Sequence, residues 1–291
     1  MSGAGGRIPR VTLLTIATAN VNGIRAAVKR GIHDWIAERS PDVLLLQEVR
    51  APDDVLNAEF PEADGWRIAH QACDLKGRAG VAVVSRLPVH AVRVGLADHQ
   101  PGADREPPVD TGRWVEADLE VAGPAGPLLL TVVSTYLHSG TNTPEKMHTM
   151  EAKYAHLDKV TARLAELSGG ATPVVVGGDL NIAHRNVDIA NWKGNLRNAG
   201  FLPQERAYLD RWLDELGWAD LGRAHGGEGP GPYTWWSWRG QSFTNDRGWR
   251  IDYQLANAAL APRCIKVEVD KAPTYEARWS DHAPVVATYE L

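Results

Sequence analysis

Short apolar runs typical of β-strands alternate along this chain with segments of helical spacing, and several neighbouring runs are joined by links of hairpin length. Four successive runs are Val81–Ser85, Val89–Leu96, Trp114–Val121 and Leu128–Tyr136. Hairpin links join antiparallel neighbours, whereas a parallel pair needs a long crossover. The pattern therefore favours an α/β fold of two packed mixed β-sheets flanked by helices over a doubly wound parallel sheet.

The other strands and helices are predicted from the same periodicities. Further strands are expected at Val11–Ala17, Val43–Leu46, Val174–Val176, Ile251–Ala256, Cys264–Val269 and Pro284–Tyr289. Apolar side chains fall at helical spacing over residues 24–36, and Ser40 and Pro41 end that helix. A long amphipathic helix follows, with an apolar stripe over residues 147–167 that we assign to core packing alone.

Length and composition set the organisation that we expect. A chain of 291 residues suits one large domain, expected over 11–291, after a flexible glycine-rich tail over 1–10. The tail has no apolar core, so no signal peptide is expected. No stretch approaches 18 apolar residues, so no membrane span is expected. Cys73 and Cys264 form no ligand motif, which favours a reducing compartment. We expect a monomer of bacterial type in the cytoplasm.

The net charge of −5 argues against a histone-like nonspecific DNA binder. It does not exclude an enzyme that acts on nucleic acids, because metal-binding carboxylates lower the total while basic residues can still cluster on one face.

Polar side chains stand beside the ends of several predicted strands. They are Asn20, Asn22, Glu48, Asp179, Asn181, Asp252, Asp281 and His282. Oxygen ligands of this kind suit Mg²⁺ or Mn²⁺ rather than a thiolate-bound zinc ion. A magnesium site that also takes phosphate oxygens implies phosphoryl transfer to water.

Each of these residues, taken singly, is better interpreted as a turn former or a cap than as part of a site. Taken together they are harder to explain structurally. Buried carboxylates need partners, and none of these segments supplies a basic residue nearby.

Five segments also carry a family resemblance: Asn20-Val21-Asn22-Gly23-Ile24-Arg25, Leu46-Gln47-Glu48, Gly177-Gly178-Asp179-Leu180-Asn181-Ile182-Ala183, Gly248-Trp249-Arg250-Ile251-Asp252-Tyr253 and Ser280-Asp281-His282-Ala283-Pro284. They resemble the exonuclease III family of abasic-site endonucleases, part of the endonuclease/exonuclease/phosphatase superfamily. The resemblance runs from about residue 11 to residue 291.

Some motifs distinguish branches of that superfamily. Gly-Asp-x-Asn and Ser-Asp-His are shared with sphingomyelinases and inositol phosphatases. Segments similar to the abasic-endonuclease branch are Asn191-Trp192-Lys193-Gly194-Asn195, Asn198-Ala199-Gly200-Phe201, Pro203-Gln204-Glu205-Arg206 and Tyr233-Thr234-Trp235-Trp236. They argue against the alternative, a phosphatase or phospholipase acting on inositol phosphates or lipids.

The resemblance implies a four-layer α/β sandwich with the site between the ends of the two sheets. It implies a class II AP endonuclease of base excision repair, which hydrolyses the phosphodiester 5′ to an abasic site in duplex DNA. It further implies 3′-5′ exonuclease and 3′-phosphodiesterase or phosphatase activity on blocked 3′ ends. All expected catalytic positions hold competent residues, which disfavours a third possibility, a binding module without chemistry.

The resemblance also assigns roles. Glu48 would be the main ligand of Mg²⁺ or Mn²⁺, with Asp281 and Asn20 or Asn22 beside it. Asp179 would orient or deprotonate the attacking water, while Asn181 would hold a phosphate oxygen.

His282 would contact the phosphate or act as a base, and Asp252 would orient it. Tyr136 would protonate the leaving oxygen or bind phosphate. Asp179, Asn181 and His282 are also candidates for the metal site.

The DNA contacts follow from the same resemblance. Arg25, Lys193, Asn195 and Asn198 are candidates to bind the DNA backbone, as are Arg50 and Arg78, although most such residues are ordinary surface groups. Trp235, Trp249 and Ile251 are expected to line a pocket that takes an abasic sugar, against the alternative that they are core residues.

The sequence departs from the family after Tyr136. The usual Tyr-x-Pro-Asn-Gly becomes Tyr136-Leu137-His138-Ser139-Gly140, so a stiffening proline is lost and Ser139 is the candidate replacement for the Asn as a donor. Asn22 stands where some relatives have Asp, which would lower the affinity for metal.

Overall fold

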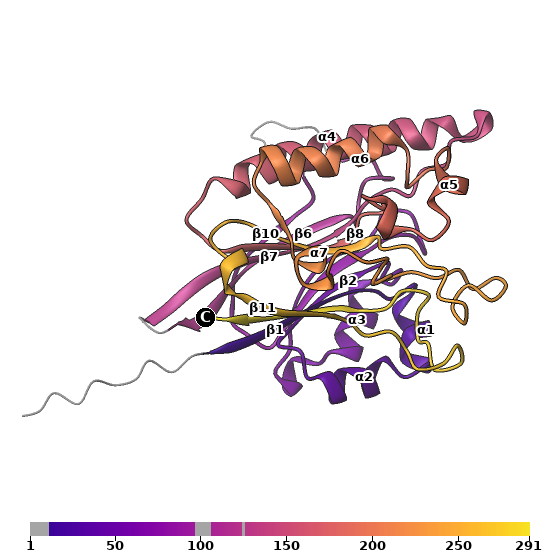
Figure 1. Cartoon of the computed structure of the whole chain (residues 1–291). Helices are drawn as coiled ribbons and strands as arrows, with labels where there is room; N and C mark the ends of the chain where they lie inside the picture. The colour runs from indigo at the N-terminus through magenta and orange to yellow at the C-terminus, as the bar shows by residue number, and fades with distance from the viewer. Residues whose placement is uncertain (1–11, 97–105, 124–125) are drawn as a thin grey trace, which may run out of the picture.

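The computed structural model describes residues 12–96, 106–123 and 126–291, and the tail expected over 1–10 lies outside these residues. Two six-stranded sheets pack face to face, and helices cover the outer face of each (Figure 1). The predicted fold of two mixed sheets flanked by helices is confirmed.

The first sheet has the strand order β11-β12-β1-β2-β4-β3. Its strands are β1 (Leu13–Asn20), β2 (Val43–Gln47), β3 (Arg67–Gln71), β4 (Val81–Ser85), β11 (Cys264–Val269) and β12 (Val285–Glu290). Only β1 and β2 are parallel neighbours in this sheet of the described chain, and the α-helical segment between them makes the crossover that parallel strands need.

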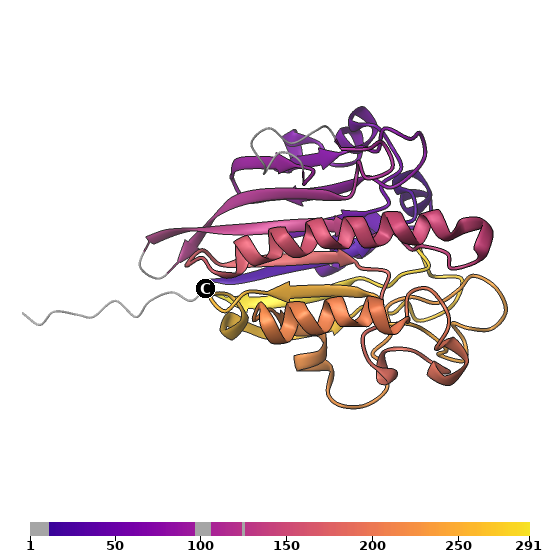
Figure 2. The same ribbon diagram turned by 90° about the horizontal axis from the view of Figure 1, so that it is seen from above.

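The second sheet has the order β5-β6-β7-β8-β10-β9. Its strands are β5 (Val89–Val94), β6 (Trp114–Gly123), β7 (Gly126–Tyr136), β8 (Val174–Asp179), β9 (Ala219–Asp220) and β10 (Asp252–Ala256). Strands β7 and β8 run parallel, and the long helix between them covers the outer face of the sheet (Figure 2).

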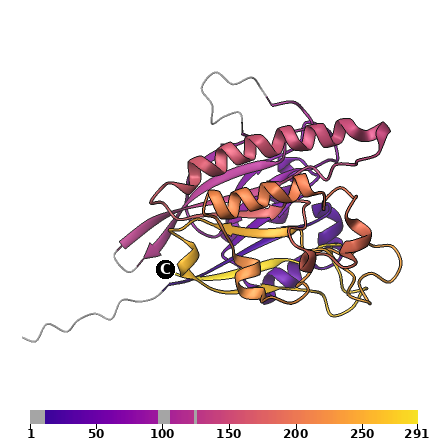
Figure 3. The same ribbon diagram turned by 45° about the horizontal axis from the view of Figure 1, so that its top comes forward.

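The helices form the two outer layers. They are α1 (Ile24–Lys29), α2 (Ile32–Arg39), α3 (Asp53–Glu59), α4 (Met147–Ser168), α5 (Trp192–Asn195), α6 (Pro203–Asp210) and α7 (Leu221–Gly226), with a π-helical turn over Arg211–Glu215 after α6. Helices α1, α2 and α3 lie under the first sheet, while α4 and α6 lie side by side over the second (Figures 1 and 3).

Alternation along the strands builds three apolar layers. Ile16 in β1 and Val43 and Leu45 in β2 face the second sheet, whereas Ala17 and Leu44 pack toward α1, α2 and α3. Because side chains of a strand point alternately to opposite faces, a strand buried on both faces reads as a continuous apolar run.

The structure corrects two local predictions. The helix expected over residues 24–36 is two helices, because Gly31 adopts a left-handed φ of 98° between α1 and α2. The short strands β3 and β9 were not predicted, since β9 has only two residues and β3 mixes charged and apolar side chains.

The topology brings polar strand ends to one edge of the sandwich. Strands β1, β2 and β8 run toward this edge and end at or just before Asn20, Glu48 and Asp179. Strands β10 and β12 run in the opposite direction, so Asp252 and the segment with His282 stand at their beginnings. Residues up to 262 positions apart in sequence therefore meet there.

Candidate active site

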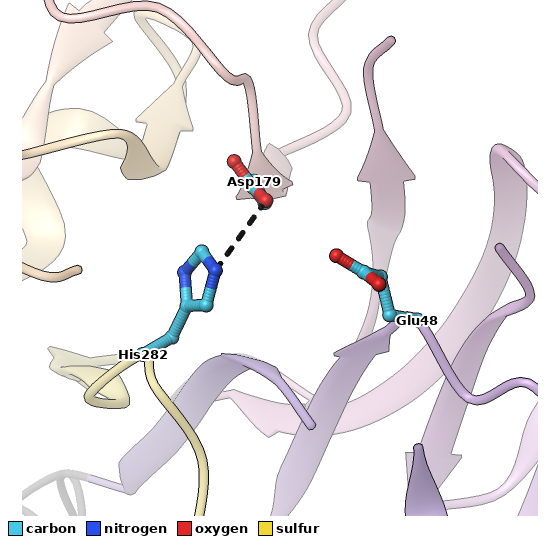
Figure 4. Close-up of side chains that lie close together, drawn as sticks. All are labelled: Glu48, Asp179 and His282. Atoms are coloured by element: carbon cyan, nitrogen blue, oxygen red, sulfur yellow. Dashed lines mark ion pairs between the residues drawn. The ribbon is translucent and has the colours of Figure 1, made fainter. Parts of the chain in front are cut away.

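Three side chains converge where the two sheets meet at this edge. Glu48 follows β2, Asp179 ends β8, and His282 precedes β12 (Figure 4). One potential ligand atom from each lies within 4.8 Å of the others, and all three residues are buried. We call Glu48, Asp179 and His282 the acidic cluster.

Asn20 lies directly behind the acidic cluster and is fully buried. Its side-chain amide donates to Glu48 Oε1 and to Asp179 Oδ2, both at 2.9 Å. The side-chain oxygen Oδ1 of Asn20 accepts the backbone N–H of Asn22 at 3.0 Å. Asn20 therefore holds a carboxylate from each sheet at a set separation.

His282 is held from behind by Asp252. The imidazole Nδ1 lies 2.9 Å from Asp252 Oδ2, and Nε2 lies 3.8 Å from Asp179 Oδ2. The backbone N–H of Asp252 donates to the Thr234 hydroxyl at 3.1 Å. The ring consequently has Nδ1 fixed by Asp252 and Nε2 turned toward Asp179.

Burial and neighbouring charges shift the pKa values here. Burial, with a contribution from the carboxylates of Asp252 and Glu48, raises the pKa of Asp179 to about 7 against the opposing effect of His282. Burial lowers the pKa of His282, but the carboxylates of Asp252 and Asp179 outweigh this and raise it to about 10. Near neutral pH the site thus holds a protonated imidazolium beside a carboxyl group that can gain or lose a proton.

Tyr136 ends β7 and pairs with Asp179 in the parallel register of β7 and β8. Burial raises the pKa of its phenol well above 10, and the carboxylates of Glu48 and Asp179 add to the effect. The phenol therefore keeps its proton and can act as a hydrogen-bond donor.

Asp281 and Asn22 stand beside the acidic cluster but are engaged with protein partners. Asp281 Oδ1 accepts from the Asn22 amide at 2.7 Å, and Asp281 Oδ2 accepts from the Trp235 indole N–H at 3.1 Å. Asp281 thereby connects the aromatic residue Trp235 to the polar edge.

Asn181 turns the chain sharply after Asp179, with a left-handed φ of 51°. Its amide donates to Leu137 O at 2.9 Å and to Asp179 Oδ2 at 3.3 Å, and its backbone N–H donates to Asp179 Oδ1 at 2.9 Å. Both amide hydrogens of Asn181 have acceptors within the protein.

The acidic cluster opens into a cavity of about 350 Å³. The cavity is lined by Asn22, Glu48, Arg50, Tyr136, Ser139, Gly140, Asp179, Asn181, Ala199, Gly200, Trp235, Trp249, Ile251, Asp281 and His282. Trp235 and Trp249 are half-buried and meet edge to face, with ring centroids 6.1 Å apart. A charged floor and an aromatic wall thus share one cavity.

Gly200 is a cavity residue that the sequence did not single out by itself. It has a left-handed φ of 87°, and a side chain there would come within 2.9 Å of the Trp249 ring. The signal that could have found it is its place in the branch-specific segment 198–201.

A second hollow of about 310 Å³ adjoins the cavity and shares Glu48, Arg50 and Tyr136 with it. Arg78 and Arg113 also line it. The expectation that no nearby basic residue accompanies these carboxylates is wrong for Glu48, which forms an ion pair with Arg50. Left-handed φ angles at both residues curl the chain back so that the two side chains meet.

Four of the predicted DNA-binding residues lie outside both hollows. Arg25 is exposed on α1, and Lys193 is exposed with its ammonium 5.5 Å from the Trp192 ring centroid. Asn198 donates to the Asn195 side chain at 2.8 Å. These four residues are therefore not part of the wall of either hollow.

The comparison with protein families decides the assignment. A model described as the Endonuclease/Exonuclease/phosphatase family matches residues 17–282. The chain belongs to this family. Within it, the chain is similar to exodeoxyribonuclease III of Haemophilus influenzae, at 30% identity over 279 residues that cover 93% of this chain and 98% of that relative.

Another relative is recombination repair protein 1 of Drosophila melanogaster, 28% identical over 96% of this chain. This chain spans only 37% of the length of that relative.

Two solved structures of the family share the fold. An AP endonuclease from Archaeoglobus fulgidus matches with a TM-score of 0.78 and 28% identity, covering 96% of this chain and all of that one. The 3′ phosphatase NExo from Neisseria, bound to a product DNA hairpin, matches with a TM-score of 0.80 and 26% identity over the same shares. The exonuclease and AP endonuclease members of the family are hydrolytic nucleases that depend on divalent metal.

Proposed function

We propose that this family member is a class II AP endonuclease of base excision repair, which hydrolyses the phosphodiester 5′ to an abasic site in duplex DNA. One observation carries the proposal: a single cavity joins the acidic cluster to the wall of Trp235, Trp249 and Ile251. Such a wall suits a sugar that has no base, while the charged floor suits the adjacent phosphate.

The same cavity supports a second activity on 3′ ends. Exodeoxyribonuclease III and the 3′ phosphatase NExo are among the similar proteins. Removal of a 3′ nucleotide or of a 3′ blocking phosphate requires the same attack on phosphorus as abasic-site cleavage. We therefore include 3′-5′ exonuclease and 3′-phosphodiesterase or phosphatase activity in the proposal.

The donor set fits Mg²⁺ or Mn²⁺. Two carboxylates from different sheets offer oxygen atoms within 4.8 Å of each other at the cavity, beside amide side chains and without a thiolate. Glu48 would hold the ion, with Asn22 and Asp281 beside it. When bound, the ion supplies positive charge that polarises the phosphate and offsets the charge that develops on it. The protonated His282 is a poor ligand and is better suited to donate a hydrogen bond.

The chain's own residues would handle the proton and the phosphate. Asp179, with a pKa of about 7, is suited to accept a proton from the attacking water near neutral pH. His282 would donate to a phosphate oxygen through Nε2, because Asp252 holds Nδ1. Asp252 is thus a positioning residue for the imidazolium.

Tyr136 and Asn181 take the remaining roles in the proposal. The phenol of Tyr136 keeps its proton, so it can donate to the leaving oxygen or to the phosphate. The amide hydrogens of Asn181 are already engaged with Leu137 and Asp179, so we assign it to orienting Asp179 rather than to holding phosphate.

The arginine-lined hollow suits the flanking DNA backbone. Arg50, Arg78 and Arg113 border it next to Glu48 and Tyr136, so a strand that places one phosphate at the acidic cluster would bring the next within reach of these guanidinium groups. Arg25, Lys193, Asn195 and Asn198 would contact the duplex farther from the cleaved bond.

The test is cleavage of a duplex oligonucleotide with one abasic site, run with Mg²⁺ and with chelator. We expect a single cut 5′ to the abasic site in Mg²⁺ and none in chelator. A matched duplex with an intact nucleotide should stay uncut at that position, and a duplex with a 3′ phosphate should lose it. No cutting of the abasic duplex, together with release of phosphate from inositol phosphates, would contradict the proposal in favour of the phosphatase alternative.

The monomeric state, the single-domain organisation and the cytoplasmic location stay predictions. None of the helices in the described part of the chain has the length and apolarity of a membrane span.

A further inference from the structure

Three loops line the cavity without belonging to either sheet. They cover residues 137–141 after β7, residues 180–183 after β8 and residues 198–202 before α6. They place Ser139, Asn181 and Gly200 around the acidic cluster. What holds these loops relative to one another therefore decides the shape of the cavity.

Lys153 connects two of these loops. It lies on α4 with its side chain fully buried, and its ammonium lies 3.2 Å from Ser139 O, 3.0 Å from Asn181 O and 2.5 Å from Glu205 Oε1. The ammonium group donates to the two backbone carbonyls and forms an ion pair with the Glu205 carboxylate. Both carbonyls belong to cavity loops.

Glu205 connects the third loop. It lies on α6 and is also fully buried. Its Oε2 accepts the backbone N–H groups of Gly200 at 2.7 Å and Leu202 at 3.0 Å. Gly200 in turn lies against the Trp249 ring and accepts the N–H of Ala183 at 2.8 Å.

Burying this ion pair costs desolvation free energy that apolar side chains at the same positions would not cost. Lys153 lies on the apolar stripe of α4 between Met150 and Leu157, where an apolar side chain would pack without desolvating a charge. Replacing a buried ion pair by apolar residues is often neutral or stabilising. The pair instead supplies hydrogen bonds to backbone groups that no apolar side chain could satisfy.

We propose that Lys153 and Glu205 are positioning residues that form one junction and fix the three cavity loops relative to one another. The junction holds Asn181 against Asp179, Gly200 against the Trp249 ring, and Ser139 at the cavity. Its effect on catalysis rests on the function proposed above, whereas its effect on the loops does not.

A matched control lies on the same helix. Glu116 on β6 is fully buried and paired with Arg163 of α4, at 2.7 Å between Arg163 Nε and Glu116 Oε1. Neither Glu116 nor Arg163 lines either of the two hollows. Glu205→Gln and Glu116→Gln are therefore the same substitution in a buried ion pair of α4, one at the junction and one away from it, where Glu116 also pairs with Arg93.

The first test is hydrogen exchange of the full chain in chelator. In Glu205→Gln we expect amides of all three loops to exchange about tenfold faster together, because local opening free energies are set by such contacts. In Glu116→Gln these amides should keep their native rates. Faster exchange confined to residues 200–202, or equal acceleration by both variants, would overturn the proposal.

The second test is steady-state cleavage of the abasic duplex at a temperature where both variants are folded. Glu205→Gln should lower kcat about 100-fold with little change in KM, since small misplacements of reacting groups are that costly. Glu116→Gln should keep the native kcat even where its melting temperature is lower. Loss of kcat in proportion to the loss of melting temperature in both variants would overturn the proposal.

If Glu205→Gln folds poorly, two variants of Lys153 test the junction instead. Lys153→Arg keeps the charge and several donors and should retain more kcat than Lys153→Met. Equal kcat in these two would contradict the junction. A native protein that leaves the abasic duplex uncut would contradict the proposed function instead, and the exchange experiment would still decide the junction.

Discussion

Two groups of buried carboxylates in this molecule have opposite surroundings. Glu116 accepts hydrogen bonds from Arg93, Arg163 and the Trp114 indole, and we call these four residues the Glu116 network. Burial raises the pKa of Glu116, but its arginine and tryptophan donors outweigh burial and lower it overall.

In the acidic cluster, by contrast, Asp179 has no arginine or lysine ion pair among the described residues, and its pKa is raised to about 7. The Glu116 network is complete without any ligand. The acidic cluster places Asp179, one imidazolium and Glu48, whose one arginine partner is Arg50, at a cavity that a cation and a phosphate would complete. The comparison teaches that a buried acid saturated by protein donors supports the fold, whereas one that is raised in pKa beside a cavity indicates chemistry.

The largest expected effect is at Glu48. Glu48→Gln keeps the size of the side chain and its contact with Asn20 but removes the charge that would hold the metal ion. We expect cleavage of the abasic duplex in Mg²⁺ to fall roughly 1,000-fold, as for loss of a main electrostatic group. If Glu48→Gln cleaved at the native rate, the acidic cluster would not differ from the Glu116 network in supporting catalysis.

The free energy of unfolding should depend more on Glu116 than on the acidic cluster. Glu116→Gln breaks a saturated buried pair and should cost about 3 kcal/mol of unfolding free energy. Asp179→Asn should behave differently in chelator. The folded pKa of Asp179 lies above its usual value of 3.8, so its carboxyl stabilises the folded state below pH 3.8 and loses that contribution as the pH rises to about 7.

The stability of Asp179→Asn relative to the native protein should therefore rise between pH 4 and pH 7. Denaturant titrations at several pH values measure both variants. A pH-independent difference for Asp179→Asn would contradict the raised pKa.

Asp252 and His282 should act as a unit. Removing either leaves the other without its role, so Asp252→Ala and His282→Ala should each lower kcat about 100-fold. The double variant should cost little more, because groups that work together are non-additive. If the effects of the two single variants were simply additive in a double-mutant cycle, Asp252 and His282 would act independently, contrary to this prediction.

The smallest effect concerns the aromatic wall. Trp249 is half-buried at the cavity, whereas Trp114 is fully buried in the Glu116 network. Trp114→Ala should cost about 3–5 kcal/mol of stability and leave the ratio of abasic-site to 3′-exonuclease rates unchanged. Trp249→Ala should cost less stability and shift that ratio about tenfold toward 3′ ends. Equal melting losses and an unchanged ratio would assign Trp249 to the core.

Much of the site could be predicted because it follows strand ends. Glu48, Asp179 and His282 stand beside apolar runs whose periodicity is plain, and the topology of mixed sheets brings such ends to a common edge. Trp249 and Asp252 both reach the site because β10 begins only at Asp252, which leaves the preceding residues free of strand alternation.

Other parts depend on contacts that local pattern does not carry. The ion pair of Glu48 with Arg50 needs left-handed φ angles that nothing in Gln-Glu-Val-Arg requires. The pairing of Lys153 with Glu205 joins two helices across 52 positions. The one signal in the sequence was a lysine on the apolar stripe of α4. Assigning the whole stripe to core packing left this lysine unexplained.

The central claim is that the acidic cluster is completed by a divalent cation held at Glu48. The most direct measurement is the melting temperature of the native protein and of Glu48→Gln as Mg²⁺ is titrated into metal-free protein, without any DNA. Because a ligand that binds only the folded state stabilises it, the melting temperature of the native protein should rise with Mg²⁺ concentration, and that of Glu48→Gln should stay constant. A native melting temperature that ignores Mg²⁺, or an equal rise in both proteins, would contradict the claim.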